Sequence, residues 1–202
     1  ITERDGPIAA HQAFFDGLKQ HDNPWGQPKA ERGAWSQGLG LKKLAEANAS
    51  TLLFAGCSAD RPSGRRGVVA LAQLMRRAGE EFVILADAEK CCGLYAFDLG
   101  FRREYERLKD DNLATVKTAG IKRIVVACGS CQRIWREYGK EAGADWRGVH
   151  GVEYVEQLVQ SGRLKFTTPI DKRVTYHDSC HLGRGCGIFR APSNILRAIP
   201  GV

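Results

Sequence analysis

Cysteine residues in four short stretches are the part of this 202-residue sequence best suited to chemistry. The first three stretches hold Cys57, then Cys91-Cys92-Gly93, then Cys128-Gly-Ser-Cys131. There are 33 residues between Cys57 and Cys91, and 35 between Cys92 and Cys128. The fourth stretch is His177-Asp-Ser-Cys180-His181. Cysteines flanked by glycine and other turn-forming residues are typical of ligand loops, so the sequence predicts a thiolate-bound metal or cluster.

The composition indicates a globular protein with reduced thiols. Hydrophobic residues make up 43% of the chain and charged residues 26%, which excludes a disordered or membrane-embedded class. No stretch has the apolar length of a membrane span, and the N-terminus is not a signal peptide. Seven cysteines, two of them adjacent, do not suit a disulfide framework, so we expect a cytoplasmic protein. The chain begins Ile-Thr-Glu, and we expect it to be part of a longer protein.

The net charge of +7 does not predict binding to nucleic acid, because no basic run is interleaved with aromatic residues. Solvated helix faces account for most of this charge. An excess of positive charge would also offset an anionic cofactor or attract an acidic partner.

Alternating elements predict an α/β fold, a parallel sheet with helices on both faces. We expect strands at 51–55, 82–85, 124–127 and 174–177, and helices at 8–18, 67–78, 101–118, 131–138 and 152–161. Ligands of such sheets bind beyond the carboxyl ends of the strands, where these cysteines fall. Helix N-termini and exposed amides at that edge would stabilise thiolates.

Three parts are expected along the chain: an arm, one domain and the start of another. Residues 1–47 form a linker arm with a turn-rich connector at 23–28, and Trp25 and Trp35 anchor the arm to the adjoining domain. Residues 48–165 form the cysteine domain. Residues 166–202 begin a second, truncated copy, because strand 174–177 with Cys180 and a helix ending near Arg197 repeats the pattern of residues 52–79.

Spacing alone leaves several functions open for the cysteines. An iron–sulfur cluster would use thiolates from glycine-flanked loops. A structural zinc site usually has two CxxC pairs, and only one is present. Thiol–disulfide exchange by Cys128-Gly-Ser-Cys131, between a strand and a helix, would leave Cys91-Cys92-Gly93 unexplained. Buried structural cysteines are the fourth interpretation.

The pattern Cys57, Cys91-Cys92-Gly93, Cys128-x-x-Cys131 resembles the CCG motif of the heterodisulfide-reductase family of iron–sulfur oxidoreductases. The resemblance implies a non-cubane [4Fe-4S] cluster, held by Cys57, Cys91, Cys92, Cys128 and Cys131. It also implies redox partner subunits, whether ferredoxin-like, flavoprotein or membrane quinone-linked. Members with two complete motifs split a disulfide, and others relay electrons, which implies a disulfide or small electron carrier as substrate. Such a protein would be cytoplasmic, alone or peripheral to a membrane complex.

The same resemblance extends to the C-terminal stretch, where Tyr176-His-Asp-Ser-Cys180 matches the opening of a second CCG repeat. Cys180 is then the first ligand of a second site, while Cys186 has no place in the motif and is expected to be structural. Gly93 and Gly129 are expected to let the backbone approach the cluster. His177 and His181 would be hydrogen-bond donors near a cluster or structural groups, and Arg184 would hold an anion or lie on the surface.

Overall fold

A three-stranded parallel sheet forms the centre of the described part of the chain. The computed structural model describes residues 2–143 and 147–202. The strands are β1 (Thr51–Phe54), β2 (Arg123–Val126) and β3 (Arg147–His150), in the order β1-β2-β3. Phe54 lies opposite Val126, and Val126 lies opposite His150. The predicted α/β fold with a parallel sheet is confirmed.

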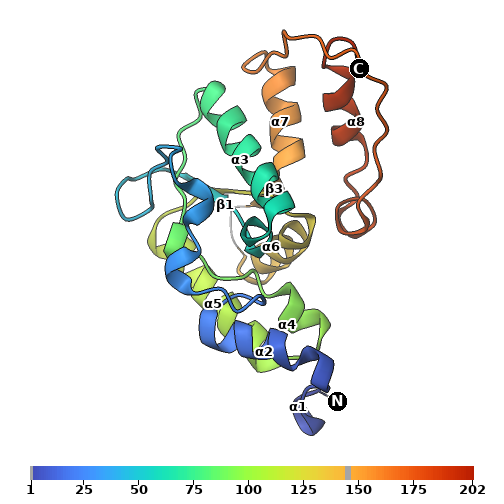
Figure 1. The fold of residues 1–202 in the computed structure, drawn as a ribbon. Helices are drawn as coiled ribbons and strands as arrows, with labels where there is room; N and C mark the ends of the chain where they lie inside the picture. Colours follow the sequence, from blue (N-terminus) through green and yellow to red (C-terminus); the bar gives the residue numbers. More distant parts are fainter. Residues whose placement is uncertain (1, 144–146) are drawn as a thin grey trace.

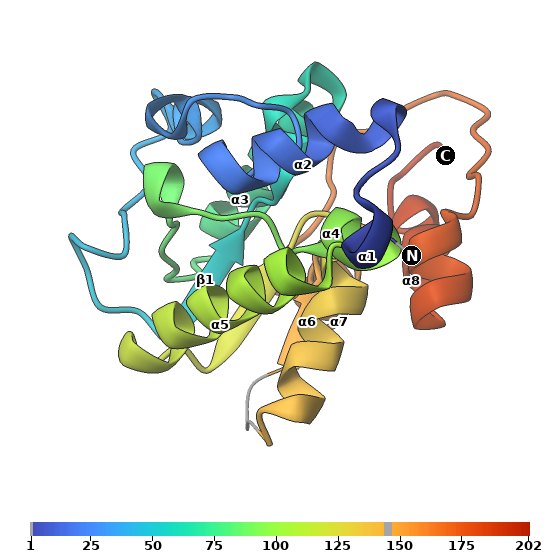
Figure 2. The ribbon, with the colours of Figure 1, turned by 90° about the horizontal axis from the view of Figure 1, so that it is seen from below.

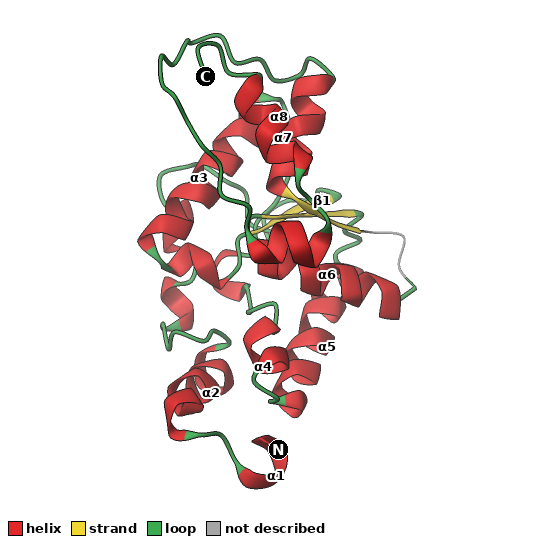
Figure 3. Ribbon diagram, turned by 90° about the vertical axis from the view of Figure 1, so that its right-hand side faces the viewer, coloured by secondary structure: helices red, strands yellow, loops and turns green. Residues whose placement is uncertain are grey.

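Helices cover both faces of this sheet, as Figure 3 shows. Alternate residues of a strand point to opposite faces, and the two faces here bury different side chains. Leu53 and Val125 pack with α3 (Pro62–Arg77) and α7 (Gly151–Gln160). Leu52 and Phe54 pack on the other face with α5 (Arg102–Thr118) and α6 (Gly129–Glu141). Most of the cysteines belong to this second face.

The N-terminal arm packs closely on the cysteine domain. Helix α2 (Ala9–His21) lies beside α4 (Leu94–Asp98) and the start of α5 (Figure 2), with Phe14 stacked on Tyr95 at 5.7 Å between ring centroids. Trp25 packs with the cysteine-bearing core and Trp35 is buried in the opposite core, so both are anchors as predicted. A further short helix, α1, spans Thr2–Asp5. No helix in residues 2–143 and 147–202 is both long and apolar enough to cross a bilayer.

The C-terminal segment lies along α7, and its helix α8 (Arg190–Arg197) packs directly on that helix (Figure 1). Before α8, the turn Cys180–Arg184 packs on the first turn of α6. The backbone amide of Leu182 would lie 3.1 Å from a Cβ at Gly129. The helix expected to end near Arg197 is therefore present.

The predicted strand at 174–177 is wrong. Residues 171–179 are exposed and irregular, and no strand in the described part of the chain pairs with them, so their backbone groups have no ladder to join. The strand predicted at 82–85 is reduced to bridges at Val83 and Ile84. The chain turns immediately afterwards at Ala86, whose φ of 52° cannot continue a strand. Strand β3 was not predicted from the sequence. Its four residues are Arg, Gly, Val and His, and only Val is a β-branched residue of the kind that favours strands.

Candidate functional site

Three loops at the carboxyl edge of the sheet bring five thiols together. Cys57 follows β1, in the turn Cys57–Asp60, and Cys91-Cys92 precede α4. Cys128 follows β2, and Cys131 lies in the first turn of α6. Four of the five are buried and Cys128 is partly exposed. The convergence expected from the parallel sheet is therefore present.

The five thiols contact one another in a continuous series. Cys57 is hydrogen-bonded to Cys91, Cys91 to Cys92, Cys92 to Cys131, and Cys131 to Cys128. The hydrogen bond from Cys57 holds the pKa of Cys91 well below its usual range, and the hydrogen bond from Cys131 lowers the pKa of Cys128 to about 5. Donation to these neighbours raises the pKa values of Cys57 and Cys131. The series therefore favours thiolates at Cys91 and Cys128.

Backbone amides also point at the sulfur atoms. The amide of Gly93 donates to Cys91 Sγ at 3.4 Å, and the amide of Leu94 donates to Cys92. The amides of Ser130 and Cys131, at the start of α6, donate to Cys128. Amide hydrogen bonds and a helix N-terminus stabilise anionic sulfur and set the potential of metal–sulfur centres. These donors fit the site to a negatively charged group.

The backbone of the cysteine loops is fixed by side chains from distant elements. The indole of Trp25 donates to the carbonyl of Cys57 at 2.8 Å, and the amide of Asn112 donates to that of Cys91 at 2.9 Å. The Tyr138 hydroxyl donates to the carbonyl of Cys92 at 2.6 Å. Because these carbonyls are paired, side chains from other elements hold the backbone of the cysteine loops in place.

A buried ionic group lies beside the Cys57 and Cys91 loops. The carboxylate of Glu89 accepts hydrogen bonds from the amides of Ala55 and Gly56, at 2.9 and 2.8 Å. Arg32 contacts both Glu89 and Asp60. Burial raises the pKa of Glu89 to about 7, while Arg32 and the two amides oppose this shift.

Glycine is required at two points of the site. Gly56 has φ 74° and ψ 165°, a conformation essentially confined to glycine, and a Cβ there would lie 2.8 Å from Cys131 Sγ. Gly93 has φ 89°, and its Cβ would meet the Tyr105 ring at 3.1 Å and the Tyr138 hydroxyl at 3.3 Å. A Cβ on Gly129 would instead meet Leu182. Of these three glycines, only Gly56 would bring a Cβ against a sulfur atom, and the expectation that Gly93 and Gly129 let the backbone approach a cluster stays a prediction.

The candidates in the C-terminal stretch lie outside this group. Cys180 is exposed and does not join the thiol series, and His177 and Arg184 are exposed as well. His181 is half-buried. Cys186 is partly buried, 4.0 Å from the carbonyl oxygen of Gly129, and packs on a small apolar cluster, in keeping with a structural role.

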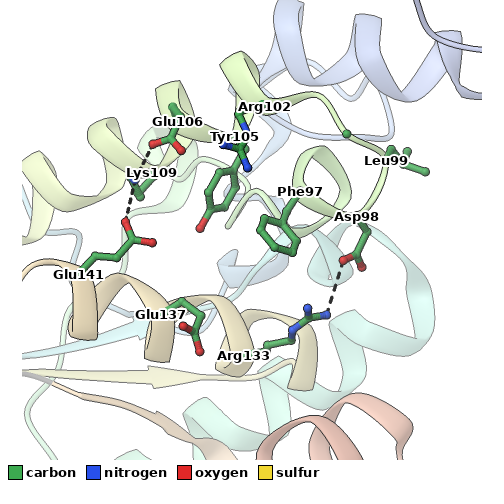
Figure 4. Close-up of a pocket in the computed structure, with 11 residues that line it drawn as sticks. Phe97, Asp98, Leu99, Arg102, Tyr105, Glu106, Lys109, Arg133, Glu137 and Glu141 are labelled. Carbon is green, nitrogen blue, oxygen red and sulfur yellow. Dashed lines mark hydrogen bonds and ion pairs between the residues drawn. The ribbon is translucent and has the colours of Figure 1, made fainter. Parts of the chain in front are cut away.

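A separate pocket of about 990 Å³ lies between α4, α5 and α6 (Figure 4). Lys109 bridges Glu106 and Glu141 across it, and Arg133 pairs with Asp98 at 3.5 Å. Tyr105 forms part of its wall and separates it from Gly93. No cysteine lines this pocket, so it is not part of the thiol site.

The donor set of the thiol site is all sulfur, which suits soft metals and iron–sulfur clusters. Among the described residues, no three His, Cys, Asp or Glu side chains surround one point as ligands of a single ion. The thiols instead contact one another in series.

Sequence reasoning missed several groups that build the site, notably Gly56, Arg32 and Glu89. A glycine directly before Cys57 at a strand end was a usable signal for close backbone approach. The sequence carried no comparable signal for Arg32 or Glu89, because their pairing joins residues 57 positions apart.

Comparisons with known proteins find a family match and several relatives. Residues 51–134 match the family model of the cysteine-rich domain, CCG. The chain is 32% identical, over its whole length, to 29% of an EtfAB:quinone oxidoreductase from Syntrophomonas wolfei. It is 31% identical, over 98% of its length, to 49% of one subunit of the dihydromethanophenazine:CoB–CoM heterodisulfide reductase of Methanosarcina barkeri.

A third relative is the probable iron-sulfur-binding oxidoreductase FadF of Bacillus subtilis, 28% identical over 95% of the chain and 28% of the relative. The chain thus spans less than half the length of each of these relatives. No solved structure gave a significant match. The comparisons lend no support to the zinc alternative. The resemblance predicted from the cysteine pattern is confirmed: residues 51–134 match the CCG cysteine-rich domain, and the relatives of the chain include a heterodisulfide reductase subunit.

Proposed function

We propose that this chain is an electron-transferring part of a heterodisulfide-reductase-like oxidoreductase. In this proposal Cys57, Cys91, Cys92, Cys128 and Cys131 hold a [4Fe-4S] cluster of the non-cubane type. The observation that carries the proposal is the series of five thiols from three loops, with backbone amides donating to three of the sulfurs. The names of the relatives, which include iron–sulfur and heterodisulfide oxidoreductases, support it.

When bound, such a cluster supplies one-electron transfer, accepting an electron from a reduced partner and passing it to an oxidised one. The chain's own residues set the conditions for this step. Buried Cys57, Cys91, Cys92 and Cys131 exclude water from most of the site. Cys128 is the partly exposed member, so a redox partner would approach from its side.

The wider assignment follows the same proposal. Residues 1–47 form an arm, 48–165 the cluster domain and 166–202 the start of a second CCG domain. Cys180 then belongs to a second, separate site. The partners would be ferredoxin-like, flavoprotein or quinone-linked subunits, with a disulfide or small carrier as substrate. Reduced thiols favour a cytoplasmic location, alone or against a membrane complex.

Metal and sulfide analysis after anaerobic reconstitution tests the proposal. We expect about four irons and four sulfides per chain, as a [4Fe-4S] cluster requires. Both should fall strongly in Cys92→Ser and stay unchanged in Cys186→Ser, the control cysteine outside the series. One zinc per chain without sulfide would overturn the proposal.

Thiol–disulfide exchange is a second candidate, favoured by the lowered pKa of Cys128 at the start of α6 and by its hydrogen bond to Cys131. It predicts metal-free reductase activity that is lost in Cys128→Ser and kept in Cys91→Ser. Loss of activity in both variants would contradict exchange by this pair alone.

A further inference from the structure

A buried arginine from the N-terminal arm lies beside the thiol site. Arg32 follows the turn Lys29–Glu31 and is 3% exposed. Arginine is almost never fully buried unless it is paired. The sequence placed residue 32 in a linker, where nothing distinguishes it from a surface arginine.

The guanidinium of Arg32 joins two segments that carry cysteines. Its Nε donates to the carbonyl of Glu89 at 3.1 Å, and its Nη2 lies 3.3 Å from Glu89 Oε1. Its Nη1 is paired with the carboxylate of Asp60. The two carboxylates are themselves buried, with side chains 3% and 4% exposed.

Both carboxylates lie next to ligand positions. Glu89 is two residues before Cys91, and it accepts the hydrogen bond from the amide of Gly56, directly before Cys57. Asp60 ends the turn that begins at Cys57. A single side chain therefore fixes the Cys57 loop and the Cys91 loop relative to each other.

The same guanidinium is a permanent positive charge beside sulfur. Its electrostatic interactions extend to Cys57 and Cys91 as well as to Glu89 and Asp60. A fixed charge acts strongly in a water-excluded site, because there is little solvent to screen it. A nearby cation stabilises the more negative, reduced state of a metal–sulfur site, and an anion destabilises it.

We propose that Arg32 is a positioning residue for the cluster, which holds the Cys57 and Cys91 loops together and raises the reduction potential of the site through its charge. Asp60 acts in the opposite direction, as a buried negative charge on the same guanidinium. This inference rests on the proposed function, since it needs a cluster on the five thiols.

Charge-changing variants separate this role from plain structural support. We would reconstitute the chain anaerobically, confirm iron and sulfide content, and titrate the cluster with dithionite while following its EPR signal. We expect the midpoint potential to fall in Arg32→Gln and to rise in Asp60→Asn. The double variant Arg32→Gln/Asp60→Asn, which restores the local net charge, should return towards the wild-type value. The Arg32→Lys variant keeps the positive charge, so its midpoint potential should stay close to the wild-type value. Its iron and sulfide content should fall in part.

Arg163→Gln is the matched control. Arg163 pairs with buried Glu80 and donates to the carbonyl of Ala78, at the helix ends on the far edge of the sheet from the cysteines. It should lower stability without shifting the potential. If Arg32→Gln does not fold, the midpoint potential of Asp60→Asn alone tests the role of charge. In that variant Arg32 stays paired with Glu89.

A midpoint potential in folded, cluster-bearing Asp60→Asn that equals the wild-type value would overturn the role of charge, as would an unchanged potential in folded Arg32→Gln. Full cluster content in Arg32→Gln would overturn the positioning role. A wild-type chain that takes up no iron and sulfide is a different result. It would overturn the proposed function, and this inference with it.

Discussion

The indole Nε1 of Trp25 donates a 2.8 Å hydrogen bond to the carbonyl oxygen of Cys57, across 32 residues of sequence. Tyr95 packs edge-on against the same indole, and the guanidinium of Arg61 lies 4.2 Å from its ring centroid. The arm is thus bound to the first cysteine loop at its backbone.

Replacing Trp25 with Phe should weaken the Cys57 loop. The ring contacts are largely kept, but the carbonyl of Cys57 loses its donor, which costs about 1–2 kcal/mol. We expect a lower melting temperature and a smaller iron content after reconstitution. Trp35→Phe, in the opposite core, is the control and should lower the melting temperature with full iron content. Equal iron contents in both variants would contradict a role for Trp25 at the site.

Replacing Gly56 with Ala should damage the site more than the fold. The backbone conformation costs about 1–3 kcal/mol for a residue with a Cβ, and that Cβ would lie 2.8 Å from Cys131 Sγ. We expect a marked loss of bound iron and sulfide. Gly67→Ala is the control, because it lies in α3 with free space around its Cβ position, and should stabilise the fold by about 0.5–1 kcal/mol. Full iron and sulfide content in Gly56→Ala would contradict this prediction, because it would mean that the site accommodates a Cβ next to Cys131 Sγ.

Stability should fall below pH 6.5 because of His150. Its imidazole is 8% exposed and accepts a hydrogen bond from the amide of Val152, and burial lowers its pKa to about 4. Since the folded state holds the neutral form, the stabilisation is complete above the unfolded pKa and is lost as the pH falls from about 6.5 to 4. The loss should reach about 3 kcal/mol. Urea unfolding at several pH values measures it.

The variant His150→Asn isolates this effect. Asparagine also accepts the hydrogen bond that caps α7 and does not titrate. The difference in stability between wild type and variant should therefore change across this pH range. A constant difference from pH 7 to pH 4 would exclude His150 as the source.

Alkylation followed by mass spectrometry should separate the cysteines into classes. Exposed Cys180 should react in both the cluster-bearing and the metal-free chain. Cys128 should react in the metal-free chain and be protected in the cluster-bearing one, because it is partly exposed and sits at one end of the thiol series. Equal labelling of Cys128 in the two forms would remove it from the ligand set.

The sequence predicted β1, β2 and the flanking helices, because β1 and β2 are short apolar runs and α3 and α5 have clear helical spacing, but it missed β3. It also predicted the meeting of the cysteines, since the carboxyl ends of parallel strands share one edge. It failed at 174–177, where Val-Thr-Tyr-His contains residues that favour strands but has no partner strand in the described chain. Pairing depends on what lies next to a segment in space, which local patterns do not contain.

The same limit applies to the site. The ligand positions follow from residue type, but the pairing of Arg32 with Glu89 and Asp60 depends on how an irregular arm folds over the domain. No periodicity marks such a contact.

The N-terminal arm lies outside the range matched by the family model but supports the cysteine loops inside that range. The family model matches residues 51–134, yet the first two cysteine loops of that segment take hydrogen bonds and a counter-charge from Trp25 and Arg32. The segment matched by the family model is therefore shorter than the unit that holds these loops in place. An expression fragment trimmed to residues 51–134 would leave Glu89 and Asp60 beside the thiols without the guanidinium of Arg32.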